Sequence, residues 1–416
     1  MKKHKFSPES LMMSHGYKPE LSEGALKCPI FQTSTFVFKN AEEGKAFFEI
    51  AYGKREKKIS EELGLIYSRI NNPDLEILEN RLCLWDEADD CAVFESGLAA
   101  ITTALLEFSK PGEVILHSSP LYGGTEHFIR SVLTKFNIGS IEFSPDLGEE
   151  EILQLVKKSG KGKNISMIYI ETPANPTNDL IDIAMCRRIA DKLSSKEREV
   201  VLAVDNTYMG PLWQHPLKHG ADLVLYSATK YIGGHSDVIA GACLGYKKHM
   251  TRIKTLRTFL GNMAAPWTGW LLMRSLETLK VRMETQSHNA QILAECLVKN
   301  PKVKKVLYPG LLKTTDAAYP IYRKQCLSPG AMISFEVKGG EKEAFKVLNN
   351  LKLIKLAVSL GSTESLAEHP ATMTHSDLSN AEKKRMGISD NLIRLSVGIE
   401  NTEDLIWDLE QSISKS

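Results

Sequence analysis

The chain has 416 residues, of which 43% are hydrophobic and 25% charged, and a formal net charge of +1 at pH 7. This balance is typical of a soluble globular protein, and the length predicts two substantial domains. Because the charges cancel, we predict neither nucleic acid nor an anionic membrane as a partner. The seven cysteines are scattered and form no C-x-x-C pair, which argues against a disulfide framework or a metal site and favours a reducing cytoplasm.

Residues 1–71 are predicted to form an irregular arm with one short amphipathic helix near Ala41–Phe48. The basic start Met1–Lys5 is not followed by an apolar segment, so we do not expect a secretory signal. No apolar run approaches the roughly 18 residues of a membrane span. The run Lys54–Lys58 mixes basic residues with glutamate, and we interpret it as a solvated surface.

Residues 72–275 have the pattern of an α/β domain with a mostly parallel sheet flanked by helices. Short apolar runs predict strands at Cys91–Glu95, Glu113–His117, Ile165–Glu171, Val200–Asp205 and Asp222–Tyr226. Helical periodicity lies between them, at Leu98–Phe108, Glu126–Lys135, Glu149–Lys158 and Asp182–Leu193. Short strands separated by helices favour right-handed crossovers and a sheet covered on both faces.

Residues 276–416 are predicted to form a smaller α+β domain. A long apolar-periodic helix that begins at Gly269 and continues as far as Leu297 is expected to connect it to the larger one. Further strand-like runs are Ala331–Val337, Leu356–Leu360 and Leu392–Val397.

Unusual polar residues gather where the predicted strands end, which is where parallel sheets bind ligands. The stretch Ser227-Ala228-Thr229-Lys230 leaves a hydrophobic strand and is followed by Gly233-Gly234. A lysine that can lose its proton is suited to a Schiff base, and adjacent hydroxyls can hold a phosphate. The simpler interpretation is a polar loop with a surface lysine.

Three other positions favour the functional interpretation. Asp205 ends a strand about 25 residues before Lys230; its carboxylate could keep a pyridine nitrogen protonated, or could only cap a turn. Ser96-Gly97-Leu98 opens a helix whose free N–H groups could cradle a phosphate, or Ser96 is a simple cap. Tyr122 could lie on a cofactor ring and serve as an acid, or could form an aromatic edge of the core.

Seven segments stand in order between about residues 29 and 399. They are Tyr67-Ser68-Arg69, Ser96–Ala100, Tyr122–Thr125, Glu171–Pro176, Asp205–Thr207, Ser227–Gly234 and Asn391–Gly398. Together they resemble the trans-sulfuration family, the Cys/Met-metabolism branch of pyridoxal-phosphate enzymes with the aspartate-aminotransferase fold (fold type I). The resemblance implies pyridoxal 5'-phosphate as cofactor, a small amino-acid substrate and a homotetramer built from two dimers.

The resemblance also implies a role for each catalytic residue. Lys230 would form the Schiff base and later move protons, Asp205 would pair with the pyridinium nitrogen, and Tyr122 would stack on the ring.

Further residues are implied to bind the cofactor and the substrate. The backbone of Gly97 and Leu98 would hold the phosphate together with Ser227 and Thr229, while Tyr67 and Arg69 would reach the phosphate of the neighbouring subunit. Arg394 would bind the substrate carboxylate through its planar fork, supported by Asn175 and Ser359.

The chain departs from the family pattern in three places. A charged insertion spans about Ala51–Leu63, and Gly124 stands where methionine γ-lyases characteristically have cysteine. Val358 stands beside Ser359, where enzymes that handle cystathionine commonly have glutamate. An apolar wall suits a thioether arm better than a distal ammonium group. We therefore favour methionine γ-lyase-type elimination, which gives a 2-oxo acid, ammonia and a thiol.

Other functions stay open. The main alternative is γ-replacement of the cystathionine γ-synthase or O-acylhomoserine sulfhydrylase type, which shares the intermediate steps and which the missing cysteine at Gly124 favours. An aminotransferase would use the same lysine and aspartate, but Tyr67, Arg69 and residues 359–365 match it less well. A non-catalytic binding module would not need this combination of lysine, aspartate, tyrosine and arginine.

Overall fold

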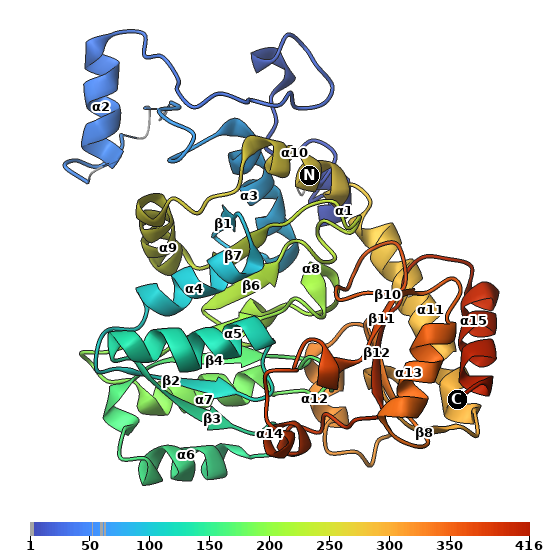
Figure 1. Cartoon of the computed structure of the whole chain (residues 1–416). Coiled ribbons are helices and arrows are strands. Elements are labelled where there is room, and N and C mark those ends of the chain that lie inside the picture. The colour runs from blue at the N-terminus through green and yellow to red at the C-terminus, as the bar shows by residue number, and fades with distance from the viewer. Residues whose placement is uncertain (1–3, 52, 59–60, 62–63) are drawn as a thin grey trace.

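The computed structural model describes residues 4–51, 53–58, 61 and 64–416. Two sheets lie side by side, the larger built from the middle of the chain and the smaller from its last third (Figure 1). None of the helices in these described ranges is long and apolar enough to span a bilayer.

The larger sheet has seven strands in the order β1-β7-β6-β5-β4-β2-β3. Their bounds are β1 Asp90–Phe94, β2 Val114–Ser118, β3 Gly139–Phe143, β4 Ile165–Glu171, β5 Val201–Asp205, β6 Leu223–Ser227 and β7 Gly241–Gly245. The strands from β6 to β3 in this order are parallel, and β7 runs antiparallel to both of its neighbours. The predicted α/β class with a mostly parallel sheet is confirmed.

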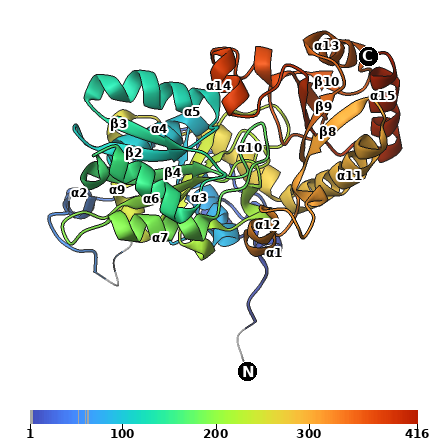
Figure 2. The same cartoon turned by 90° about the horizontal axis from the view of Figure 1, so that it is seen from below.

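Helices cover both faces of this sheet, as Figure 2 shows from below. In β4, Ile168 and Ile170 pack into one core cluster while Met167 and Tyr169 pack into another. The first cluster includes side chains of α3 (Pro73–Asp86), α6 (Glu149–Lys158) and α7 (Ile183–Leu193), and the second includes those of α4 (Gly97–Glu107) and α9 (Lys247–Leu260). Burial on both faces explains why these strands are continuous apolar runs.

The smaller sheet has the order β10-β11-β12-β9-β8. Its strands are β8 Val303–Leu307, β9 Met332–Val337, β10 Lys355–Leu356, β11 Leu366–Glu368 and β12 Leu392–Ser396. The helices of this part of the chain are α11 Leu279–Lys299, α12 Tyr319–Gln325, α13 Glu341–Asn350, α14 Asn380–Arg385 and α15 Thr402–Ser414. Helices α11 and α13 contact β9, and α15 packs on both of them. This is the expected smaller α+β unit.

The predicted connecting helix over 269–297 is wrong as one continuous element. It divides into α10 (Pro266–Leu276) and α11, because Thr278 leaves the helical conformation. The guanidinium of Arg282 reaches back across the break and donates to the carbonyl of Ser275 at 3.0 Å and to Thr278 Oγ1 at 3.2 Å. It also donates to the carbonyl of Tyr231 at 2.9 Å, so the break is fixed by a contact distant in sequence.

Two other predicted elements are corrected. The helix expected over 126–135 begins earlier, as α5 (Gly123–His127), and continues as a π turn at Phe128–Val132 and a 3-10 turn. The strand expected at Leu356–Leu360 is shorter and is observed as β10, which ends at Leu356. The residues after it leave the strand, because Ser359 accepts hydrogen bonds from Lys230 and Arg394.

Four strands were not predicted: β3, β7, β8 and β11. Strand β7 begins and ends with glycine, which lowers its strand propensity. The tertiary structure requires Gly241, because a Cβ there would lie 2.1 Å from the carbonyl oxygen of Ser96.

The N-terminal arm projects from the body and carries α2 (Ala41–Ala51), in agreement with the predicted amphipathic helix (Figure 1). Two short helices complete the described chain, α1 (Pro8–Leu11) and α8 (Gly210–Trp213). Part of the charged insertion over 51–63 lies outside the described residues, namely 52, 59–60 and 62–63. In the rest, Arg55 pairs with Glu61 at 2.6 Å and Glu49 at 3.2 Å, and the lysines are exposed, as expected for a solvated surface.

Candidate active site

A cavity of about 310 Å³ lies where β4, β5 and β6 end, and residues from the C-terminal part of the chain also line it. Most of the site residues predicted from the sequence line it: Gly97, Leu98, Tyr122, Asn175, Asp205, Ser227, Thr229, Lys230, Val358, Ser359 and Arg394. Tyr67 and Arg69 do not. The structure thus gathers eleven positions that span almost 300 residues of sequence into one site.

The first turn of α4 forms one wall of this cavity. Ser96 is the N-cap, and its Oγ accepts the N–H of Ala99 at 3.0 Å, so the capping interpretation of Ser96 is confirmed. The N–H groups of Gly97 and Leu98 belong to the first turn, where no helical acceptor exists. A Cβ on Gly97 would lie 2.7 Å from Cβ of Ser227. Glycine therefore lets α4 approach β6, and the turn forms a cradle suited to an anion.

The two hydroxyls near this cradle differ. Thr229 Oγ1 donates to the carbonyl of Ala240 at 3.2 Å and accepts its N–H at 3.0 Å, which fixes the loop before Lys230. Ser227 stands at the end of β6 against Gly97 and also lines the cavity. Backbone N–H groups and a hydroxyl together fit a phosphate group.

Lys230 extends into the cavity from the turn after β6, and its Nζ donates to Ser359 Oγ at 3.0 Å. The pKa of Lys230 is lowered to about 8, mainly by burial and also by the positive charge of Arg394, while the charge of Glu368 opposes this. A larger share of the amine is therefore neutral near pH 7 than in an exposed lysine. A neutral, buried amine is what covalent attachment to an aldehyde requires.

Asp205 ends β5 and is buried. Its Oδ1 accepts the N–H of Thr207 at 3.0 Å and its Oδ2 accepts the hydroxyl of Tyr169 at 3.2 Å, so it does also cap a turn. Burial raises the pKa of Asp205, and within the described chain no cation pairs with it. A buried carboxylate without a cation is costly. A protonated ring nitrogen would remove that cost, so the site fits a pyridine cofactor.

Tyr122 precedes α5 and its side chain is 46% exposed, so the interpretation as an edge of the core is wrong. Glu171 holds the surrounding turns: its Oε2 accepts the N–H of Tyr122 at 2.7 Å and its Oε1 accepts that of Asn175 at 3.1 Å. A Cβ on Gly124 would lie 2.7 Å from Cε1 of Tyr122. The absent side chain at Gly124 therefore lets the tyrosine ring lie close to its own backbone turn.

Arg394 is held at the other end of the cavity by β12. Its Nη1 donates to Glu368 Oε1 at 2.8 Å and to Asn175 Oδ1 at 3.1 Å, and its Nη2 donates to the carbonyl of Ser359 at 2.9 Å. The hydroxyl of Tyr208 also donates to Asn175 Oδ1, at 2.7 Å. Asn175 and Ser359 thus support Arg394, as the resemblance implies.

Several residues that contact the site were not predicted from the sequence, among them Tyr169, Glu171, Tyr208 and Glu368. Glu171 ends a predicted strand, which is a signal that could have identified it. Glu368 gives no such signal, because only the pairing of β11 with β12 brings it to Arg394.

Tyr67 and Arg69 lie apart from this cavity in the arm region. Arg69 Nη1 donates to the carbonyl of Thr258 at 2.7 Å, and its guanidinium carbon lies 5.8 Å from the ring centre of Tyr67. Both side chains are exposed. Their assignment to the site of a neighbouring subunit stays a prediction.

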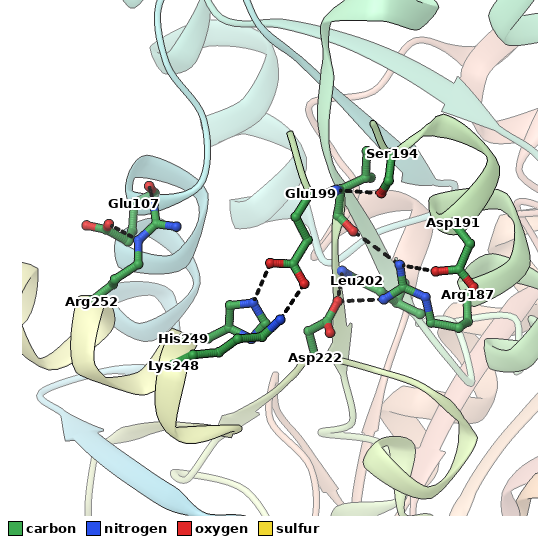
Figure 3. Close-up of polar contacts among 11 residues, drawn as sticks. Glu107, Arg187, Asp191, Ser194, Glu199, Leu202, Asp222, Lys248, His249 and Arg252 are labelled. Carbon is green, nitrogen blue, oxygen red and sulfur yellow. Dashed lines mark hydrogen bonds and ion pairs between the residues drawn. The ribbon is translucent and has the colours of Figure 1, made fainter. Parts of the chain in front are cut away.

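A second group of titratable side chains lies outside the cavity (Figure 3). Ligand atoms of Glu199, Asp222 and His249 lie within 4.8 Å of one another. However, Asp222 pairs with Arg187 at 2.7 Å, and Glu199 pairs with Lys248 at 2.6 Å. Because cations already compensate both carboxylates, we interpret this cluster as an ion-pair network and not as a metal site.

The family model for the Cys/Met metabolism PLP-dependent enzymes matches residues 9–414. The chain belongs to this family. It is 41% identical over 394 residues to an L-methionine gamma-lyase of Fusobacterium nucleatum subsp. nucleatum, covering 94% of each chain. It is 40% identical over 351 residues to the human cystathionine gamma-lyase, covering 84% of each.

Solved structures give the same assignment for this pyridoxal-phosphate enzyme. The cystathionine gamma synthase of Xanthomonas oryzae pv. oryzae, in complex with aminoacrylate and cysteine, superimposes with a TM-score of 0.87 at 30% identity over 99% of both chains. MetB of Corynebacterium glutamicum gives a TM-score of 0.86 at 33% identity, over 99% of this chain and 98% of that one. The trans-sulfuration family, the fold and the cofactor inferred from the sequence are confirmed.

Proposed function

We propose that this enzyme removes the γ-substituent of methionine-like amino acids and releases a 2-oxo acid, ammonia and a thiol. The observation that carries the proposal is the wall beside Ser359, where Val358 lines the cavity and offers no charge. A distal ammonium group would find no counter-ion there, whereas a thioether arm needs none. The identity to methionine gamma-lyases supports this choice.

The residues that would hold pyridoxal phosphate are Lys230 at the aldehyde carbon, Asp205 at the ring nitrogen and Tyr122 beside the ring. Gly97, Leu98 and Ser227 would surround the phosphate, Thr229 would order the loop beside it, and Asn175 would support both cofactor and substrate. When bound, the cofactor supplies an electron sink for negative charge at the substrate Cα.

The other steps belong to side chains of this chain. Arg394 would fix the substrate carboxylate, which places the Cα proton near Nζ of Lys230. With a pKa lowered to about 8, Lys230 would take the proton from Cα, give it up again and, once its amine is neutral, take one from Cβ. Tyr122, which lines the cavity and is 46% exposed, would donate the proton of its hydroxyl to the leaving sulfur.

A second candidate function is γ-replacement on an activated homoserine. The observation that favours it is Gly124, which stands in place of the cysteine typical of methionine γ-lyases and leaves the ring of Tyr122 close to the turn. The fold similarity to a cystathionine gamma synthase agrees with this alternative.

The proposal extends to the assembly and the domains. We propose residues 1–71 as an arm that contacts a partner subunit, 72–275 as the cofactor domain and 276–416 as the C-terminal domain, in a homotetramer of two dimers. Exposed apolar side chains on the arm, such as Leu26 at 84% and Val37 at 94%, support a covering partner. The free cysteines support a cytoplasmic location.

Product analysis tests the reaction. We expect kcat/KM for methionine to exceed that for cystathionine and that for O-acylhomoserine with cysteine or sulfide. Clear preference for either of the latter would overturn elimination from methionine as the main activity.

The shared site has its own test. In Arg69→Ala, loss of one charge-assisted phosphate contact should weaken cofactor retention by about 1.5–3 kcal/mol. Sedimentation should show at least a dimer, and a fully active monomer would contradict the proposed assembly.

A further inference from the structure

Glu368 shares the guanidinium that the proposed function assigns to the substrate carboxylate. Strands β11 and β12 pair antiparallel with Glu368 directly opposite Arg394, so the two side chains meet across the sheet. Arg394 Nη1 lies 2.8 Å from Glu368 Oε1, and the residues are only 3% and 0% exposed. The pairing is therefore built into the register of the sheet.

The other contacts of Arg394 are neutral. Nη1 also donates to Asn175 Oδ1, and Nη2 donates to the carbonyl oxygen of Ser359. Within the described ranges, Nε has no partner, and Glu368 is the one acidic group paired with this guanidinium. A substrate carboxylate would thus be the second anion on one cation.

Two carboxylates close together in a buried site disfavour each other's ionised form. Glu368 cannot turn to solvent, since it is fully buried and held in a strand that pairs on both sides. Its Oε1 accepts the hydroxyl of Thr374 at 3.0 Å, whereas its Oε2 has no partner among the residues that the structure describes. A proton on Oε2 would remove the repulsion without breaking either contact of Oε1.

We propose that Glu368 takes up one proton when a substrate carboxylate binds Arg394, and so makes substrate binding depend on pH. One proton leaves the solvent and joins Oε2, while Arg394 exchanges an ionised glutamate for an ionised substrate. Glu368 acts here as a positioning residue that works through Arg394. The inference rests on the proposed function, because it requires Arg394 to be the carboxylate ligand.

The charged and titratable groups around Glu368 agree with this. Burial raises the pKa of Glu368, and the opposing influences are Arg394 first, then the hydrogen bond from Thr374 and the charges of Lys230 and His369. Burial lowers the pKa of neighbouring His375 to about 4, so that it adds no charge near pH 7. Once a substrate carboxylate shares Arg394, the guanidinium lowers the pKa of Glu368 less strongly. Glu368 then takes up a proton.

Calorimetry on the cofactor-loaded enzyme tests the proposal. The probe is 4-(methylthio)butanoate, which has a carboxylate and a thioether but no amine to react with the cofactor. Titrations in two buffers with different ionisation enthalpies give the number of protons taken up per bound probe, between pH 6 and 9. For the wild type we expect uptake that approaches one proton as pH rises, with Kd increasing about tenfold per pH unit above the pKa of Glu368.

Two variants identify the group. Glu368→Gln, which keeps the shape but cannot ionise, should bind without proton uptake and with a Kd that does not change with pH. Glu336→Gln is the matched control, because Glu336 lies in β9, beside β12, but pairs with Lys304 at 2.8 Å. It should behave like the wild type.

The outcomes separate the two proposals. Absence of proton uptake in the wild type at every pH, or equal uptake in Glu368→Gln, would overturn the role of Glu368. The wild-type count needs no variant, so this test holds even if Glu368→Gln does not fold. An unchanged Kd in Arg394→Lys would instead show that Arg394 is not the carboxylate ligand, and the proposed substrate site would fail.

Discussion

Introduction of a carboxylate at Val358 should move the substrate preference towards cystathionine, and the structure sets the size of the change. Val358 lines the cavity beside Ser359 and its side chain is 58% exposed. A glutamate there would meet the distal ammonium of cystathionine in contact with water. Ion pairs in such surroundings contribute about 0.2–1 kcal/mol, far less than buried pairs. Because 1.4 kcal/mol corresponds to a factor of ten, the expected change is at most about fivefold.

The assay is kcat/KM for cystathionine relative to methionine in the wild type, Val358→Glu and Val358→Gln. The glutamine variant has the size of glutamate without its charge, so it separates electrostatics from shape. We expect the ratio to rise in the glutamate variant only, and the rise to shrink with added salt because solvent-exposed charges are screened. An unchanged ratio, or an equal rise in the glutamine variant, would refute the role assigned to charge at this position.

Four further predictions concern the cofactor, the substrate carboxylate and the stability of the apoenzyme. Lys230→Ala should fold, bind pyridoxal phosphate only non-covalently and lose turnover. In the wild type, borohydride reduction and peptide mapping should label Lys230, and a label on another lysine would contradict this. Since the pKa of Lys230 is lowered to about 8, attachment of added cofactor to the apoenzyme should speed up with rising pH and level off above about pH 8, where an ordinary lysine would still be gaining. Arg394→Lys should raise KM about 10- to 150-fold, because a point charge replaces a fork and loses about 1.5–3 kcal/mol, with little change in cofactor retention; wild-type kinetics would exclude Arg394. Tyr169→Phe should lower the free energy of unfolding of the apoenzyme by about 1–3 kcal/mol, because it removes the hydroxyl that donates to the buried Oδ2 of Asp205; an unchanged free energy of unfolding in urea would contradict this.

Much of the larger sheet could be predicted from local pattern. The strands β2, β4, β5 and β6 are continuous apolar runs because both of their faces are buried, and helices with a 3.6-residue period lie between them. Once the strands are known to be parallel, their carboxyl ends must lie at one edge. Asp205 and Lys230 follow two such ends, so their meeting in one cavity is a consequence of the local pattern.

The remaining features depend on residues far apart in the chain. Gly241 carries no strand signal and is required only because Ser96 lies against it. The break at Thr278 is fixed by Arg282, which also bonds to Tyr231. Ser359 meets Lys230 although 129 residues separate them. Local periodicity contains no information on such contacts, because they depend on how segments far apart in the chain pack together.

Glu368 and Arg394 show this difference most directly. The resemblance to the family implied the arginine, but nothing in the residues around Glu368 indicates that its carboxylate faces a guanidinium. The register of β11 against β12 places them opposite each other, and a shift by one residue would turn Glu368 to the other face. Local pattern determines which residues form strands, since it reflects burial within a few residues. Only the packed sheet decides which two charges share one site, because register is set by contacts along the whole strand pair.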